Sequence, residues 1–110
     1  MAKKRIKKTG TVPPQLIGVH LDAVAIGATA FGLEPNPPCI MASFAAGNQA
    51  TEIDFESRAG QEMIGYLLGK ITDPKVKTGS FVLEYDGRRY QCQVTVDQKR
   101  NPQRVEVTWT

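Results

Sequence analysis

Few residues in this chain have the types and spacing that catalysis requires. The closest group is a set of three carboxylates, Glu52, Asp54 and Glu56. Paired carboxylates can act as general acid and base when their environments hold their pKa values apart. These three alternate with apolar residues in "ATEIDFE", a period that places them on the exposed face of a strand. We therefore interpret them as solvated charges and assign them no catalytic role.

The chain also lacks the residue spacing of a phosphate-binding loop, of a nucleophile–base pair and of a zinc site. The stretch "GYLLGKITD" has glycines and a lysine but lies in a helical pattern and lacks the GxxxxGK[ST] spacing of a phosphate-binding loop. A nucleophile and base would have to combine His20, the only histidine, with Cys39, Cys92 or a serine, and the spacing supports no such pair. Two distant cysteines predict free thiols rather than a disulfide or a zinc site. We expect no enzyme, no metal and no cofactor.

The net charge of +3 is unevenly distributed along the 110 residues. Five basic residues lie within positions 3–8, seven acidic against two basic residues lie in 9–74, and seven basic against three acidic residues lie in 75–104. The folded part is therefore bipolar, which differs from the uniform basic face of a dedicated nucleic-acid-binding protein. Such a distribution suits a partner of mixed charge or a second copy of the chain.

Residues 1–12 are predicted to form a flexible basic arm and residues 13–110 a single α+β domain. The start of the chain has the positive region of a signal peptide but no apolar region after it, and no run approaches the length of a membrane helix. We expect a cytoplasmic protein without a membrane-inserted segment.

The apolar pattern predicts two helices and about six strands in the order α-β-β-β-α-β-β-β, forming an antiparallel or mixed sheet with both helices on one face. A first helix opens at Pro13-Pro14 and ends before Gly27. His20 lies within this helix and is interpreted as a residue at the boundary of the core rather than as a ligand or base. The second helix is expected to be capped by Ser57 and stopped by Asp73-Pro74. The expected apolar positions are Leu16, Ile17, Leu21 and Val24 in the first helix, with Val19 and Ala23 beside them, and Met63, Ile64, Leu67, Leu68 and Ile71 in the second.

The predicted strands carry three further expectations. The first strand, Thr29 to Glu34, is expected to end at Pro35, so that Glu34 terminates a strand rather than serving a site. Asp86-Gly87 lies between two alternating runs and predicts a type I′ hairpin. That turn pairs Tyr85 with Arg88 and places Glu84 opposite Arg89 as a cross-strand ion pair. A last strand, "RVEVTWT", places Val105, Val107 and Trp109 on one face.

Four segments carry a resemblance to a known family. They are "LDAVAIGATAFGLEPNPP", "AGQEMIGYLLGKI", "TGSFVLEYDGRRYQCQVTV" and "QRVEVTW". Together they resemble the amino-terminal domain that precedes the motor in the ATPases of type II secretion and type IV pili, over about residues 15–110. The resemblance implies a PAS-like fold and a domain that packs against a neighbouring motor.

This chain lacks the polar residues that are typical of that family at several aligned positions. The family's Ser-Asp-Ile-His segment aligns with Thr29, Ala30, Phe31 and Gly32, and family arginines align with Ala42, Phe44 and Gln93. The resemblance assigns those arginines to bringing the domain onto bound nucleotide, so this chain has no residues for that role. No motor with its phosphate loop follows within these residues, and the chain alone is not expected to hydrolyse ATP.

Two functional hypotheses remain. The first is a non-catalytic interaction, regulatory or adaptor domain whose partner is a secretion or pilus motor ATPase or a copy of itself. Its contact would join a basic edge to an acidic surface, comprising Arg88, Lys99, Arg100 and Arg104 on one side and Glu52, Asp54, Glu56 and Glu62 on the other. The second, less favoured, is a nucleic-acid or anionic-ligand module that uses the arm and the same basic edge.

Overall fold

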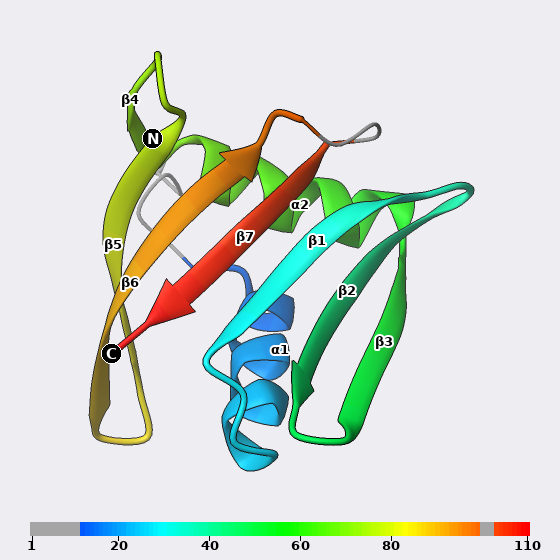
Figure 1. The fold of residues 1–110 in the computed structure, drawn as a ribbon, viewed down its shortest axis with the longest axis vertical. Helices are drawn as coiled ribbons and strands as arrows, with labels where there is room; N and C mark the ends of the chain where they lie inside the picture. The colour runs from blue at the N-terminus through cyan, green and yellow to red at the C-terminus, as the bar shows by residue number, and fades with distance from the viewer. Residues whose placement is uncertain (1–11, 100–102) are drawn as a thin grey trace, which may run out of the picture.

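A computed structural model describes residues 12–99 and 103–110, and it contains two helices and a seven-stranded antiparallel sheet (Figure 1). The α+β class predicted from the sequence is confirmed. The elements are α1 (Pro14–Ala25), β1 (Ala30–Asn36), β2 (Cys39–Ala46), β3 (Gln49–Glu56), α2 (Ser57–Leu68), β4 (Ile71–Asp73), β5 (Thr78–Tyr85), β6 (Arg88–Asp97) and β7 (Arg104–Trp109).

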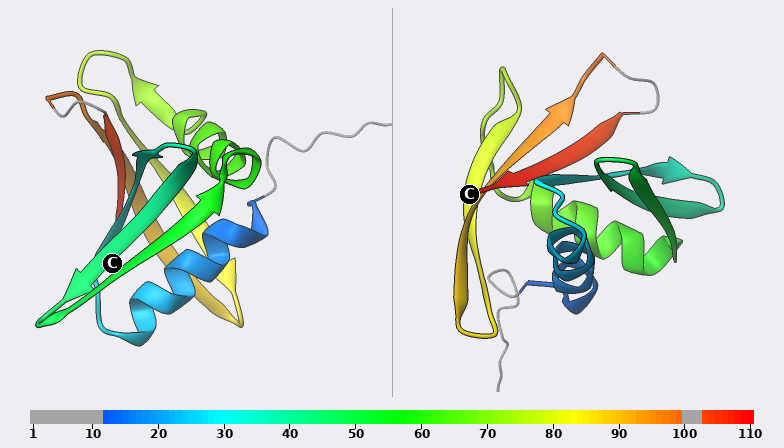
Figure 2. Two further views of the ribbon diagram at one scale, coloured as in Figure 1. Left: turned by 90° about the vertical axis from the view of Figure 1, so that its right-hand side faces the viewer. Right: turned by 60° about the horizontal axis from the view of Figure 1, so that its bottom comes forward.

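The strand order is β3-β2-β1-β7-β6-β5-β4, so the first and last strands of the chain pair at the centre of the sheet. Figure 2 shows that the sheet is strongly twisted and that α1 and α2 both lie on its concave face. The core fills the space between them and includes Leu16 and Val19 of α1, Met63 and Leu67 of α2, and Phe31, Leu33, Leu83 and Val107 of the sheet. Within the described ranges, no helix is long and apolar enough to cross a membrane.

The predicted count of about six strands was wrong by one, because the second helix ends early. Helix α2 stops at Leu68, and Ile71, expected on its apolar stripe, lies in the short strand β4 opposite Gly79 of β5. A side chain on Gly79 would collide with the carbonyl oxygen of Lys70, so glycine lets the two backbones approach closely. Ser57 is the first residue of α2, and the N-cap position is occupied by Glu56 without a side-chain hydrogen bond.

Helix α1 buries only part of the apolar face that was predicted for it. Its buried residues are Leu16, Val19, His20 and Ala23, whereas Leu21 is 48% exposed. These positions recur every three to four residues, so the helical period was right, and the buried face is centred on Val19 and Ala23 rather than on Leu21. Its end was placed correctly. Gly27 adopts a φ of 85°, and the next residue, Ala28, donates its N–H to the oxygen of Ala23.

Strand β1 continues through Pro35 to Asn36, so the predicted end at Pro35 was wrong. Pairing of β1 with β7 stops at Leu33, opposite Val105, while pairing with β2 continues to Asn36 opposite Cys39. Beyond Leu33 the strand is therefore locally an edge, where proline's missing N–H is tolerated. Consequently Glu34 lies inside a strand rather than at its end.

The hairpin of β5 and β6 has the predicted register. Tyr85 pairs with Arg88 and Glu84 with Arg89, and the Arg89 Nη1 to Glu84 Oε2 distance is 3.2 Å. Asp86 and Gly87 have φ values of 52° and 72°, as a type I′ turn requires. A local turn signal and alternating flanks were enough to fix this register.

Candidate interaction surface

The convex face of the sheet carries no helix among the described residues, and its side chains are mostly polar. Along β6 the exposed residues Gln91, Gln93 and Thr95 alternate with buried Cys92 and Val94, and β7 alternates in the same way. This alternation is typical of an antiparallel sheet with one face packed and the other in contact with water. The convex face and the two sheet edges are therefore available to a partner.

A buried ion pair crosses this face between strands that are distant in sequence. Arg104 Nη1 on β7 donates to Glu34 Oε1 on β1 and to Ser43 Oγ on β2, both at 2.8 Å. Its Nε lies 3.3 Å from Glu106 Oε2. The Arg104 and Glu34 side chains are only 14% and 15% exposed. The guanidinium is thus committed to an internal contact that ties three strands together.

Gly32 of β1 provides the space for that contact. A Cβ built on Gly32 would collide with Arg104, and its three nearest atoms all belong to the guanidinium. A glycine inside a strand is a known sign of close approach by another group. It is the one sequence signal that could have indicated this arrangement, because Arg104 and Glu34 are 70 residues apart.

The predicted basic edge is not a continuous surface. Arg88 is exposed at the start of β6 and Lys99 is exposed just beyond its other end. A ten-residue strand separates them by about 30 Å. Arg104 is held by Glu34, and Arg100 lies outside the described residues. The described residues therefore do not bring these basic groups together.

The predicted acidic set is largely gathered on one strand. Glu52, Asp54 and Glu56 are exposed on β3, opposite Ser43, Met41 and Cys39 of β2, and so project from the convex face. Asn36 donates a hydrogen bond of 3.3 Å to Asp54 from the end of β1. Glu62 is exposed on α2, in the helix layer on the other side of the sheet. Three of the four acidic residues thus form one row.

This acidic row lies on a free edge of the sheet. Among the described strands, β3 is the last in the sheet and pairs only with β2, over all eight of its residues (Figure 1). Its other face carries Ile53 and Phe55, which are half-buried against the core. An edge strand presents unpaired N–H and C=O groups that can pair with another strand. The described part of β3 therefore offers backbone hydrogen bonding together with negative charge.

His20 lies within α1, as predicted, but it is fully buried, so its interpretation as a residue at the boundary of the core was wrong. Its Nδ1 lies 2.5 Å from the Tyr85 hydroxyl, and its ring contacts Tyr90 and Trp109 edge to face at centroid distances of 4.4 Å. Burial lowers the pKa of His20 from 6.5 to about 4 and, as the main cause, raises the pKa of Tyr85 to about 12. Both groups are neutral near pH 7 and form part of the packed interior.

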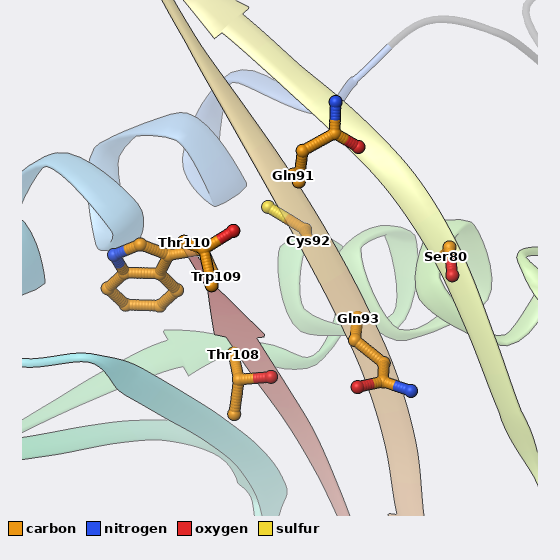
Figure 3. A pocket seen from close by; sticks show the side chains of 7 residues that line it. All are labelled: Ser80, Gln91, Cys92, Gln93, Thr108, Trp109 and Thr110. Atoms are coloured by element: carbon orange, nitrogen blue, oxygen red, sulfur yellow. The ribbon is translucent and has the colours of Figure 1, made fainter.

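Two shallow depressions lie on the described surface. One, of about 310 Å³, is lined on the sheet by Ser80, Gln91, Gln93 and Thr108 with the chain end (Figure 3). The other, of about 380 Å³, lies where the end of α1 meets the hairpin and includes Leu21, Tyr85 and Arg88. Within the residues described, no group of three or more His, Cys, Asp or Glu side chains could hold a metal ion.

The edge of β3 can therefore bind a partner strand by backbone hydrogen bonds and by charge complementarity. The convex face is cross-linked by the contacts of Arg104 with Glu34 and Ser43. Comparison of the sequence with known proteins adds no further assignment. A scan against models of known protein families found no match to this chain, and a search of curated proteins found no similar sequence.

Proposed function

We propose that this domain is a non-catalytic protein-interaction module that contacts its partner through the acidic edge of β3. The observation that carries the proposal is that β3 combines a free edge with the row Glu52, Asp54 and Glu56. A strand of this kind recognises an extended segment by backbone hydrogen bonds, with side-chain charge selecting the partner. The expected partner segment is extended and basic.

The resemblance to the amino-terminal domains of secretion and pilus motor ATPases supports an adaptor or regulatory role in the cytoplasm. An α+β domain with both helices on one face of an antiparallel sheet is compatible with the PAS-like fold that this resemblance implies. We propose two protein partners for the β3 edge, a second copy of the chain and a motor ATPase of that class from the same genome.

A nucleic-acid function has less support. Binding to phosphates needs basic groups spaced along one surface. Arg88 and Lys99 lie at opposite ends of β6, and Arg104 is engaged by Glu34. Binding to single-stranded or duplex DNA that falls steeply with salt and disappears when residues 1–11 are removed would favour this alternative over the proposed function.

Charge reversal on β3 tests the proposed function. We expect the double variant Glu52→Lys/Asp54→Lys to weaken binding at least about tenfold, because two attractive cross-strand positions become repulsive. Lysine is well tolerated on edge strands, so the variant should remain folded. Binding of wild type and variant to the immobilised chain and to the purified motor ATPase is measured by biolayer interferometry.

The matched control is Asp22→Lys/Glu84→Lys, which makes the same change in net charge away from β3. Asp22 is exposed on α1, and Glu84 is 63% exposed on β5. This control should bind as wild type does. Equal weakening by both double variants would show a general charge effect and contradict the assignment to β3.

A further inference from the structure

The unpaired edge of β3 has a specific counterpart in this chain. The segment before the described residues reads "MAKKRIKKTGT" and carries five basic residues within positions 3–8. We propose that residues 3–8 of a second copy of the chain add to β3 as an antiparallel strand. This inference rests on the proposed function of the β3 edge and names the partner that occupies it.

The alternation of the two segments matches residue by residue. Lys3, Arg5 and Lys7 recur every two residues, the same period as Glu52, Asp54 and Glu56. In a strand, such residues project to one face. An antiparallel alignment with Arg5 opposite Asp54 places Lys3 opposite Glu56 and Lys7 opposite Glu52. Three pairs of opposite charge then lie on the convex face.

The same alignment places suitable side chains over the apolar face of β3. Ile6, the apolar residue between Arg5 and Lys7, falls opposite Ile53, which is half-buried against the core. Lys4 falls opposite Phe55, where its long apolar stem can cover the ring while its charge reaches water. A shift of one residue would place Ile6 among the carboxylates and the basic residues over the apolar face. The pattern therefore excludes shifts by an odd number of residues, and among the antiparallel alignments that remain this one forms the most pairs of opposite charge.

The tether between the arm and its own helix makes a second copy the source of the strand. Figures 1 and 2 show α1 beginning beside α2 and running toward the end of the molecule that holds the β2–β3 turn. Antiparallel pairing places Lys8 opposite Thr51, near that turn and away from the start of α1. Four residue steps from Lys8 to Val12 reach about 14 Å at most, whereas Thr51 to Glu56 alone spans about 17 Å. A second copy of the chain is not limited by this short tether, and we therefore take it as the source of the added strand.

Reciprocal exchange of arms would give a closed symmetric dimer. Each copy donates one arm and accepts one, so no free β3 edge remains. All six strand pairings in the sheet are antiparallel, and the added strand continues that pattern at its edge. The expected mass is twice the 12.1 kDa of one chain.

Disulfide trapping in the full chain tests the partner and the direction of the strand together. The cysteine pair Lys7→Cys/Glu52→Cys is compared with Lys3→Cys/Glu52→Cys, both with Cys39→Ser to remove the half-buried native thiol on the neighbouring strand. We expect the first pair to form a disulfide-linked dimer under mild oxidation and the second to remain uncross-linked. A dimer from the second pair alone, a disulfide within one chain, or no disulfide in either would overturn the proposal.

Exchanging the charges between the arm and β3 tests the pairing by recovery of the dimer, which a folding defect would not produce. Arg5→Glu/Lys7→Glu and Glu52→Lys/Asp54→Lys should each weaken the dimer at least about tenfold, and the fourfold variant that combines them should restore it. The control Lys4→Glu/Lys8→Glu, on the other face of the arm, should weaken it less. Failure of the combined variant to recover would contradict the pairing. If Glu52→Lys/Asp54→Lys weakens binding to the motor ATPase while Arg5→Glu/Lys7→Glu changes neither that binding nor the dimer, this inference is overturned. The proposed function of the β3 edge would then still hold.

Discussion

Replacing Arg104 with alanine is expected to lower the free energy of unfolding by about 3 kcal/mol, at the low end of the cost of breaking a buried ion pair. The guanidinium donates at 2.8 Å to both Glu34 and Ser43, and its side chain is only 14% exposed. Alanine removes every one of these bonds and leaves polar groups of β1 and β2 with little access to water. Equilibrium urea unfolding of wild type and variant measures the loss.

The hairpin ion pair supplies the matched control. Arg89 and Glu84 join neighbouring strands of the same sheet at 3.2 Å, but their side chains are more than 60% exposed. Arg89→Ala should therefore cost less than about 1 kcal/mol. Equal losses from Arg104→Ala and Arg89→Ala would show that burial of the Arg104 pair contributes nothing.

The position of Arg104 over Gly32 adds a test of coupling. Gly32→Ala should destabilise the wild type, because its Cβ collides with the guanidinium. In the Arg104→Ala background the same change should be nearly neutral, since the three nearest atoms have been removed. The double-mutant cycle thus measures the contact directly. Additive effects of the two changes would contradict this arrangement.

Acidification is expected to destabilise the domain through His20. Its pKa is lowered by burial to about 4, whereas the unfolded chain titrates at 6.5, so the unfolded state binds the proton more readily. Stability is therefore fully present above pH 6.5 and is lost progressively as the pH falls toward 4. At about 1.4 kcal/mol for each pH unit, the loss amounts to about 3 kcal/mol.

The chain contains one histidine, so its imidazole signals can be followed by NMR without overlap from other histidines. Proton NMR of the imidazole follows the pKa of His20, and urea unfolding at pH 4 to 7 follows the free energy. His20→Phe keeps an aromatic ring among Tyr90 and Trp109 but cannot titrate, so its stability should fall by about 3 kcal/mol less over this range. A measured pKa near 6.5 would contradict the expectation.

The sequence predicted the fold best where the signals are local. The hairpin register follows from the Asp86-Gly87 turn and its alternating flanks, and β2 and β3 follow from alternation alone. The prediction failed at Ile71, where an apolar residue at helical spacing belongs to the next strand. Periodicity along the helix contains no information about Gly79, which lies eight residues beyond Ile71. The close approach of Gly79 to the backbone of Lys70 belongs to the pairing of β4 with β5.

The candidate site was predictable only in part. The alternation of Glu52, Asp54 and Glu56 placed them on one exposed face, but that β3 forms an edge depends on the strand order of the whole sheet. Arg104 was expected on an open surface because net charge and spacing contain no information about Glu34, which lies 70 residues away. Burial of His20 likewise depends on the aromatic residues that the hairpin and β7 bring to α1.

Hydrogen exchange at β3 shows whether this edge contacts a partner. Backbone amides of residues 49–56 that do not bond to β2 are followed in the concentrated full chain, alone and mixed with the motor ATPase. We expect slowed exchange at these amides in at least one sample. The slowing should be lost in Glu52→Lys/Asp54→Lys and retained in Asp22→Lys/Glu84→Lys. Unchanged exchange along β3 in both samples would contradict the claim that this edge is the interaction surface.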